Sequence, residues 1–314
     1  MKGVGGVRRS VVVLATLVVA VFTQVPAHAG GVVLDKVIGG PEAQTLPFAN
    51  DTYLTWTQNS EARPNRFNAF GGALDGSGRF RLNESGTTGF TGGIDPGTNV
   101  AIYQQIADGR SSLYTIDLDT KDRDKLPRPV NSRKWEWAPR ISNAYILFQR
   151  EENGRTNLYL YDRVADSLDL LHSVDSSAAF LFAGSVGEDF ATWTVCARAC
   201  NAFVYDIVPA DKTKLPAPEG KHQYAPTVDE DTSTAYFVRS GNACGANVGI
   251  WRRPVDLSTG AEQVATLPPG IDTGWTLALD VDVANGRLDA WFEYFRCAGQ
   301  QGDVYEAQGL RSLV

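Results

Sequence analysis

The chain has 314 residues, with 36 acidic against 29 basic side chains and a formal net charge of −7. This balance argues against nucleic acid and anionic membrane surfaces as partners, because both bind basic patches. The length suits one large β-domain or two ordinary domains. The 31 glycines, the single methionine and the scarcity of helical spacing favour an all-β chain over a mixed one.

The first 29 residues are typical of a secretory signal peptide. Lys2, Arg8 and Arg9 make a basic start, an apolar run extends over 11–22, and 27–29 has the small-x-small form of a cleavage site. The apolar run is shorter than the roughly 20 residues of a spanning helix, and an uncleaved anchor is the alternative. Cleavage predicts one secreted or periplasmic domain, residues 30–314, without stable membrane insertion. Its net charge is −10 once the three leader cations are lost.

The stretch from Trp135 to His172 is the clearest structural unit in the sequence. It contains four short strand-like segments separated by polar turns, beginning at Trp135, Ala144, Leu158 and Leu168. Four such strands form one antiparallel sheet. Because a sheet of this kind cannot bury both of its faces alone, it needs neighbours of the same kind.

The same four-strand pattern recurs along the chain, and we label its strands a to d. The predicted b strands begin near residues 52, 98, 144, 189, 234 and 288, in steps of 46, 46, 45, 45 and 54. A period of 40 to 50 residues with four strands is typical of propeller blades. We therefore predict a six-bladed β-propeller, with blades at about 41–83, 86–127, 134–172, 178–216, 221–267 and 272–310.

The last blade runs out of chain after its c strand. The strand-like run at 32–37 is otherwise unassigned, and we predict that it supplies the missing outer strand of that blade. Closure of this kind removes sheet edges that would otherwise invite aggregation. A disordered N-terminal arm is the alternative.

All four cysteines lie in the second half of the chain, in or beside predicted b-to-c loops. An even count after an export signal predicts two disulfides, with three pairings open from the count alone. Metal binding is the alternative, but there is no paired CxxC motif and no nearby histidine. The blade positions predict the pairs Cys196–Cys200 and Cys244–Cys297, the second joining blades five and six.

In a propeller, strand a lines the central channel, and the b-to-c and d-to-a loops share one face. Aromatic side chains recur there at the starts of the a strands, either as packing between blades or as a ligand platform. Charged side chains fill the b-to-c loops of the same face, either merely solvated or forming a contact surface. The candidate binding residues are Trp135, Arg150, Glu151, Arg155, Arg198, His222, Tyr224, Trp275 and Arg296.

The opposite face carries the a-to-b turns, whose acidic residues are mostly turn formers. A calcium site at Asp229-Glu230-Asp231 is a weaker alternative, since consecutive carboxylates in a hairpin point to different sides. The mature chain has only two histidines, His172 and His222, and it lacks HExxH, G-x-S-x-G and a phosphate loop. No catalytic residue, metal or cofactor is therefore predicted.

The segment Trp137-Ala138-Pro139 followed by Tyr145-Ile146-Leu147-Phe148 and Tyr159-Leu160-Tyr161-Asp162 resembles the TolB-type propeller repeat. Tyr224-Ala225-Pro226 and Asp95-Pro96-Gly97 match it in part. The chain departs from the Asp-Gly turn of that repeat, because Arg140-Ile141-Ser142-Asn143 follows the proline. The resemblance implies a propeller that serves as a platform for protein interaction.

Two functional hypotheses follow. The first is an exported, monomeric propeller that binds another exported protein or a small ligand through its b-to-c loop face. The alternative is a propeller lyase or hydrolase acting on a saccharide or lactone at the central channel. An enzyme would need at least three convergent polar groups in one pocket of the channel.

Overall fold

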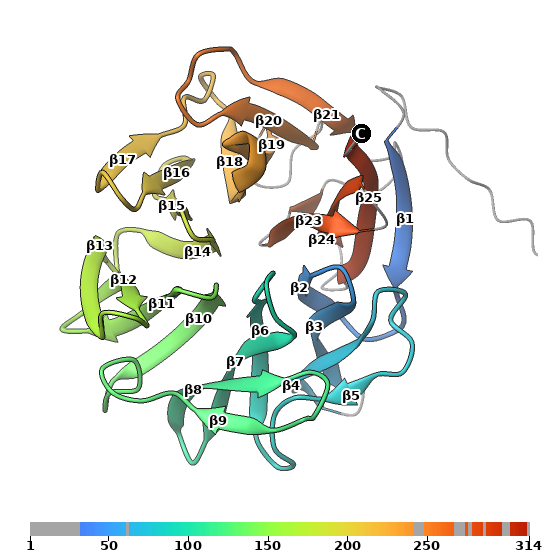
Figure 1. The fold of residues 1–314 in the computed structure, drawn as a ribbon, viewed down its shortest axis with the longest axis vertical. Helices are drawn as coiled ribbons and strands as arrows, with labels where there is room; N and C mark the ends of the chain where they lie inside the picture. Colours follow the sequence, from blue (N-terminus) through green and yellow to red (C-terminus); the bar gives the residue numbers. More distant parts are fainter. Residues whose placement is uncertain are drawn as a thin grey trace, which may run out of the picture.

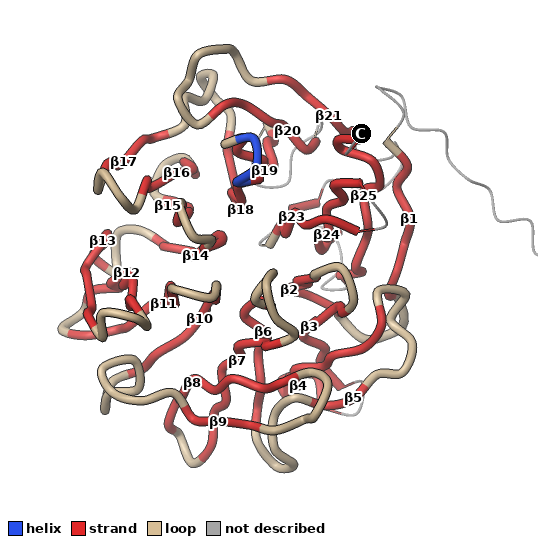
Figure 2. Tube along the Cα trace, viewed as in Figure 1, coloured by secondary structure: helices blue, strands red, loops and turns tan. Residues whose placement is uncertain are grey.

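The computed structural model describes residues 32–60, 63–241, 248–266, 274–275, 278–284, 287–296 and 302–312. Over this part of the chain, six sheets form a ring around a central axis (Figure 1). The predicted six-bladed β-propeller is confirmed. The helix seen among these residues is a short 3₁₀ turn at Glu230–Thr232 (Figure 2). No helix in the described ranges has the length and apolarity to cross a membrane.

Blades one to three each contain four antiparallel strands, and the innermost strand comes first along the chain (Figure 1). Their strands are β2 (Gln44–Ala49), β3 (Tyr53–Ser60), β4 (Arg63–Ala73) and β5 (Phe80–Arg81); β6 (Thr88–Ile94), β7 (Val100–Ala107), β8 (Arg110–Asp117) and β9 (Arg123–Lys125); and β10 (Trp135–Ile141), β11 (Tyr145–Glu152), β12 (Arg155–Asp162) and β13 (Ser167–Asp175).

Blades four and five repeat this order, and blade six adds a strand from the other end of the chain. Their strands are β14 (Phe180–Val186), β15 (Phe190–Cys196), β16 (Cys200–Asp206) and β17 (Asp211–Lys214); β18 (His222–Asp229), β19 (Thr234–Ser240), β20 (Gly249–Pro254) and β21 (Glu262–Thr266); and β22 (Gly274–Trp275), β23 (Leu279–Ala284), β24 (Arg287–Arg296), β25 (Gly302–Ser312) and β1 (Val33–Ile38). The observed b strands begin within two residues of the predicted starts. In blade six the expected single a strand consists of two short strands, β22 and β23, which both pair with β24.

A repeated aromatic position builds the core between the blades. The fourth or fifth residue of every b strand is an aromatic side chain that is at most 1% exposed, namely Trp56, Tyr103, Phe148, Trp193, Phe237 and Trp291. In blades one to four this ring stacks on an aromatic ring directly opposite in strand c, with centroids 5.6–5.8 Å apart. Such cross-strand aromatic pairs stabilise a sheet beyond the area they bury. In these four blades the aromatic pair thus helps to hold the register of the b–c hairpin.

A bulge interrupts the innermost strand of blades one to five. In blades one, three and five the bulge lies at Leu46, Ala138 and Ala225, each with a positive φ and each followed by proline. Proline has no N–H and cannot continue the hydrogen-bonded ladder, so the register shifts at that point. Gly92-Gly93 and Gly184-Ser185 occupy the same place in blades two and four. The bulges change the direction of the side chains that follow them, so that these side chains face the axis.

Blade six closes the ring. Strand β1 pairs antiparallel with β25, from Val33 opposite Gln308 to Lys36 opposite Tyr305. Val32 and Leu34 pack into the apolar core that blades five and six share. The prediction that the N-terminal strand closes the last blade is confirmed.

Candidate functional site

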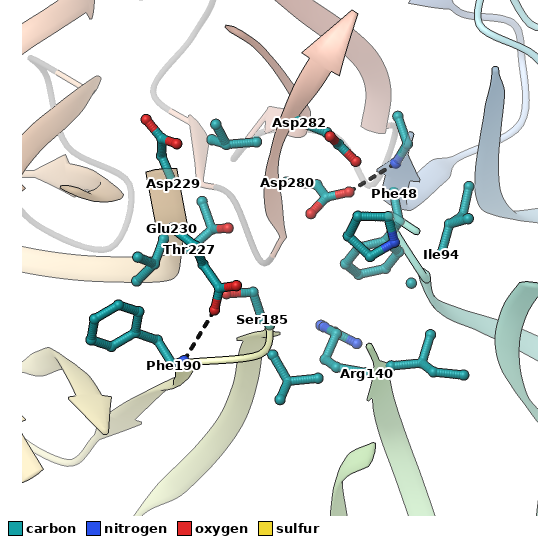
Figure 3. A pocket seen from close by; sticks show the side chains of 18 of the residues that line it. Phe48, Ile94, Arg140, Ser185, Phe190, Thr227, Asp229, Glu230, Asp280 and Asp282 are labelled. Carbon is teal, nitrogen blue, oxygen red and sulfur yellow. Dashed lines mark hydrogen bonds between the residues drawn. The ribbon is translucent and has the colours of Figure 1, made fainter. Parts of the chain in front are cut away.

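A pocket lies on the axis at the end of the molecule where the a-to-b turns meet (Figure 3). Its volume is about 240 Å³, and all six blades contribute to its wall through the ends of their innermost strands. This end is opposite to the b-to-c face on which the sequence placed its candidates. The pocket has three distinct parts: a cationic floor, an acidic wall and an apolar wall.

Arg140 forms the floor of this axial pocket. It directly follows the bulge at Ala138-Pro139, and only 4% of its surface is exposed. Its guanidinium donates to the carbonyl oxygens of Gly184, Pro139, Ala183 and Gly92 at 2.5, 2.7, 3.0 and 3.5 Å. It also lies 4.3 Å from the centre of the Phe48 ring. Arg140 thus ties together blades one to four at the axis.

Burial lowers the pKa of the Arg140 guanidinium to about 10, while the charges of Asp280 and Glu293 favour its protonated form. Arg140 therefore stays charged at neutral pH. Glu293 is fully buried and accepts from the backbone N–H groups of Leu46 and Ala278, at 3.0 and 2.8 Å. The Arg140 guanidinium is therefore surrounded by carbonyl oxygens and lies in the field of buried carboxylates.

Asp280, on β23, stands on the acidic wall of the pocket (Figure 3). Its Oδ2 accepts a hydrogen bond of 2.8 Å from the backbone N–H of Ala49, which joins blade six to blade one. Burial raises the pKa of this carboxyl to about 6, against the lowering effects of the Ala49 amide and of Arg140. Asp282 lines the same wall two residues further along the strand. The Asp280 carboxyl is therefore mostly ionised at neutral pH.

The a-to-b turn of blade five, Asp229-Glu230-Asp231, completes this wall. Its carboxylates form hydrogen bonds and ion pairs with the neighbouring blades. Glu230 accepts from three backbone N–H groups of the blade-four turn, those of residues 188, 189 and 190, at 2.9–3.1 Å. Arg311 of blade six lies 2.9 Å from Asp229 and 3.6 Å from Asp231. Among the described residues no group of three or more His, Cys, Asp and Glu side chains is placed to hold a metal ion. The calcium alternative at this turn finds no support there.

The four candidates on blade three have different surroundings at the opposite end. Trp135 begins the innermost strand and is 38% exposed. Arg150 is buried, with its Nε 3.0 Å from the fully buried carboxylate of Glu136. Arg155 is exposed and donates to the hydroxyl of Ser173 at 2.7 Å. Arg150 is therefore part of the packing, whereas Trp135, Arg155 and the exposed Glu151 are at the surface.

Three further candidates, Arg198, His222 and Tyr224, lie on blades four and five. The predicted disulfide between Cys196 and Cys200 is present and closes the b-to-c turn that carries the exposed Arg198. His222 Nδ1 accepts from the Cys200 backbone N–H at 3.2 Å. The His222 ring stacks on Tyr224, which is only 7% exposed. His222 and Tyr224 thus pack against the disulfide-closed turn.

Some predictions fall outside the described part of the chain. Trp275 and Arg296 belong to paired strands, but their side chains are not described. Cys244 and Cys297 lie outside the described residues, so their pairing stays a prediction. The signal peptide at 1–29 lies outside them as well.

Sequence reasoning missed two features. Phe180 starts the innermost strand of blade four, is 68% exposed and stacks on Phe182. Its position matches that of Trp135 in blade three, which is the signal that would have identified it. Arg140 was noted only as a departure from the repeat, although it stands where the bulge directs a side chain to the axis.

Comparison with solved structures agrees with the ring of six sheets. The putative TolB from Agrobacterium tumefaciens aligns with a TM-score of 0.57 and 13% identity, covering 82% of this chain and 92% of that one. TolB from Acinetobacter baumannii aligns with a TM-score of 0.55 and 14% identity, covering 82% of this chain and 63% of that one. The fold is that of a TolB-like six-bladed propeller.

The same fold also occurs in an enzyme. An oligogalacturonate lyase in complex with manganese aligns with a TM-score of 0.50 and 11% identity, covering 90% of this chain and 94% of that one. At such identities the likeness concerns the fold alone, and the chain spans less than two thirds of the Acinetobacter protein. No protein-family model matches the sequence, and no curated protein is significantly similar to it.

Proposed function

We propose that this protein is an exported binding module that contacts a partner protein through its b-to-c face. The observation that carries the proposal is a pair of exposed aromatic side chains, Trp135 and Phe180, at 38% and 68% exposure. Both begin the innermost strands of neighbouring blades, and these strands pack against each other. Exposed aromatic residues of this kind supply most of the binding energy in many protein interfaces.

Charge around this pair indicates the chemistry of the partner. Arg133, Lys134, Arg155 and Arg198 are exposed on the loops of blades three and four at this end. Glu151, Asp175 and Glu219 are exposed acids at the same end. A local excess of cations on a chain of net charge −7 favours an acidic partner surface. We therefore assign the face to an acidic protein of the same compartment.

Export is part of the proposal. The N-terminal 29 residues have the form of a signal peptide. The Cys196–Cys200 disulfide is of the kind that persists in oxidising compartments. The protein would thus meet its partner outside the cytoplasm.

The alternative of a lyase or hydrolase stays a prediction from the sequence. The polar groups of the axial pocket already have structural partners: Arg140 donates to four carbonyl oxygens and Asp280 accepts from the Ala49 amide. Groups engaged in this way favour binding over proton transfer, so we do not extend the proposal to catalysis.

The test compares two matched pairs of substitutions in the full chain. We expect the double substitution Trp135→Ser with Phe180→Ser to raise the Kd for the exported partners that the protein captures at least tenfold. A tenfold change in Kd corresponds to a loss of about 1.4 kcal/mol of binding free energy. Val164→Ser with Val208→Ser removes apolar side chains that are even more exposed, at 85% and 82%, from the c-to-d turns of the same two blades. This control should leave binding unchanged.

Replacing Arg155 and Arg198 by alanine gives a second readout. Because exposed charges steer association, we expect this variant to bind more slowly and with a weaker dependence on salt. Capture of the same partners, with the same affinity, by the aromatic double variant would rule out this face. Loss of binding in the valine control alone would move the contact surface to the other end of the molecule.

A further inference from the structure

Blade five carries a buried arginine that matches Arg150 of blade three. Arg239 follows the aromatic residue Phe237 by two positions on strand b, as Arg150 follows Phe148. Each guanidinium lies 5.2 Å from the ring centre of that aromatic residue. Each also lies over an aromatic ring of strand c, at 5.0 Å in blade three and at 4.3 Å in blade five. The two blades therefore place the same cation in the same aromatic surroundings.

In blade three the chain itself supplies the acceptors for this cation. Arg150 donates from Nε to the carboxylate of Glu136, which is directly opposite on strand a, at 3.0 Å. Its Nη2 donates to the carbonyl oxygens of Pro129 and Val130, at 2.6 and 3.2 Å. Both carbonyls belong to the linker that enters the blade. Arg150 thus has a counter-charge and satisfied donors, as a buried cation requires.

Blade five lacks these acceptors. Gln223 stands opposite Arg239 in the place that Glu136 has in blade three, so a neutral amide replaces the carboxylate. The linker from the last leucine of the preceding blade to strand a is also shorter, at 216–221 against 127–134. Within the described residues Arg239 has no hydrogen bond or ion pair, and its Nε is buried without a partner. Even a hydrogen bond to the neutral Gln223 would leave the charge of Arg239 without a counter-charge.

The groups next to Arg239 add positive charge and a further unpaired donor. Burial lowers the pKa of the Arg239 guanidinium, and the charge of Arg253 lowers it further. Arg253 is itself buried and donates to the carbonyl oxygen of Thr259 at 3.0 Å. The indole N–H of Trp251, whose ring lies beneath Arg239, is buried without a partner. A buried cation in such surroundings is unfavourable, and an anion beside it would offset this effect.

The position of Arg239 and its match in blade three indicate the kind of anion. Arg239 is the second-last residue of β19, so it lies at the b-to-c end of the molecule (Figure 1). The equivalent Arg150 is paired with a carboxylate of this chain, and a guanidinium offers parallel N–H groups that match a planar carboxylate. A phosphate dianion would need a second free cation, whereas Arg253 is engaged with Thr259. A carboxylate therefore fits best.

We infer that Arg239 binds a carboxylate group that enters from the b-to-c end, where blades four and five pack against each other. The carboxylate accepts hydrogen bonds from the guanidinium while the guanidinium stays on the ring of Trp251. An acidic side chain and the C-terminus of a chain offer the same group. That the carboxylate belongs to the partner protein rests on the proposed function, whereas the site itself does not.

Titration of the full chain with two pairs of probes tests this site, with the Nε–H signal of Arg239 in proton–nitrogen NMR spectra as the readout. The α-amide of N-acetylglutamic acid presents a side-chain carboxylate, and the α-amide of N-acetylglutamine is its neutral counterpart. N-acetylglycine presents a terminal carboxylate, and N-acetylglycinamide is its neutral counterpart. We expect at least one carboxylate to bind with a Kd at least tenfold lower than that of its counterpart and lower than that of inorganic phosphate. The pair that responds distinguishes a side chain from a C-terminus.

Substitutions then locate the site, with calorimetry as the readout. We expect Arg239→Gln to raise the Kd of the bound carboxylate at least tenfold, while Arg252→Gln changes it less than twofold. The control removes the same charge from the other face of β20, where Arg252 is paired with Glu262 at 2.9 Å. Without a probe, Arg239→Gln should leave the thermal midpoint unchanged or raise it, because it removes a buried charge that has no counter-charge. Arg150→Gln should lower the midpoint, because it breaks a buried ion pair.

Several outcomes would overturn the inference: equal binding of a carboxylate and its neutral counterpart, no binding by either carboxylate, tighter binding of inorganic phosphate, or an unchanged Kd in Arg239→Gln. A midpoint that falls as far in Arg239→Gln as in Arg150→Gln would also overturn it, because Arg239 would then be a paired structural residue. The protein contact has a separate readout in the aromatic double variant. Its failure would leave the carboxylate site in place.

Discussion

Arg140 shows how one residue closes the centre of a ring of sheets. Burial of an isolated charge is unfavourable because the charge loses its hydration. Carbonyl oxygens from three blades offset this loss by accepting hydrogen bonds from the planar guanidinium of Arg140. A lysine could not reproduce this, because its ammonium is a single point with three donors. The arginine is therefore specified by geometry as well as by charge.

Asp280 leads to a prediction about pH and stability. Its pKa rises from 3.8 to about 6 on folding, so the folded protein holds this proton more tightly than the unfolded chain does. By linkage, its contribution to the free energy of unfolding falls as pH rises from about 4 to about 6. Above about pH 6 the buried, ionised carboxylate keeps the free energy of unfolding lower than it would be without this charge. Asp280→Asn removes this cost and keeps an acceptor for the Ala49 amide.

We therefore expect Asp280→Asn to stabilise the protein by about 1–2 kcal/mol at pH 8 and to have almost no effect at pH 4. Urea unfolding at the two pH values measures this difference. Asp256→Asn is the matched control, because hydrogen bonds to Ser258 lower the pKa of that exposed carboxyl. Its effect should have the opposite sign. Equal stabilisation by Asp280→Asn at both pH values would contradict the burial of this carboxylate.

At the scale of the element, the bulge in each innermost strand decides where side chains point. The bulge allows neighbouring inner strands to approach closely, and glycine is required at two of these contacts. A Cβ on Gly184 would lie 2.3 Å from the Pro226 carbonyl oxygen, and a Cβ on Gly92 would lie 2.4 Å from that of Pro139. Both distances are far shorter than any Cβ contact allows. The inner ring is thus packed backbone against backbone.

Gly184→Ala is expected to destabilise the protein by about 1–3 kcal/mol, because the rigid backbone of blade five cannot move away from the added methyl group. Gly260→Ala is the control, since nothing lies within 4 Å of a Cβ at that exposed position. Guanidinium unfolding of the two variants measures the difference. If Gly184→Ala unfolds at the same denaturant concentration as Gly260→Ala, the inner strands are less tightly packed than the structure indicates.

For the whole molecule, stability depends on how the ring closes. Strand β1 from one end of the chain covers the edge of β25 from the other, over the pairs Val33–Gln308 to Lys36–Tyr305. Arg311, on the same strand β25, is paired with Asp229 of blade five. Long-range contacts of this kind cost chain entropy when they form.

Deletion of residues 33–38 is expected to lower the thermal midpoint by at least about 5 °C and to produce dimers or larger species, because it exposes the edge of β25. Thermal unfolding and size-exclusion chromatography measure the two effects. Lys36→Ala is the control, since it removes only an exposed ion pair with Asp303. That pair should contribute less than about 1 kcal/mol. A monomeric deletion variant with an unchanged midpoint would mean that β1 does not close the ring.

The periodic signals in the sequence were sufficient for the architecture. Strand spacing near 45 residues, alternation of apolar side chains and turn residues are local properties, so they predicted six blades, the closing strand and the Cys196–Cys200 pair. The aromatic position in each b strand is equally local. It recurs at nearly the same place in every repeat.

The axial pocket could not be predicted in this way. Arg140, Asp280 and Phe48 are far apart in the chain and meet only because six inner strands converge on one axis. Arg150 is likewise buried only because the folded chain brings Glu136 and the carbonyl oxygens of Pro129 and Val130 to its guanidinium. The sequence by itself determined which segments become strands and how often they repeat, because those properties depend on nearby residues. The tertiary structure alone decided which side chains face the axis, because bulges and contacts between blades set their direction.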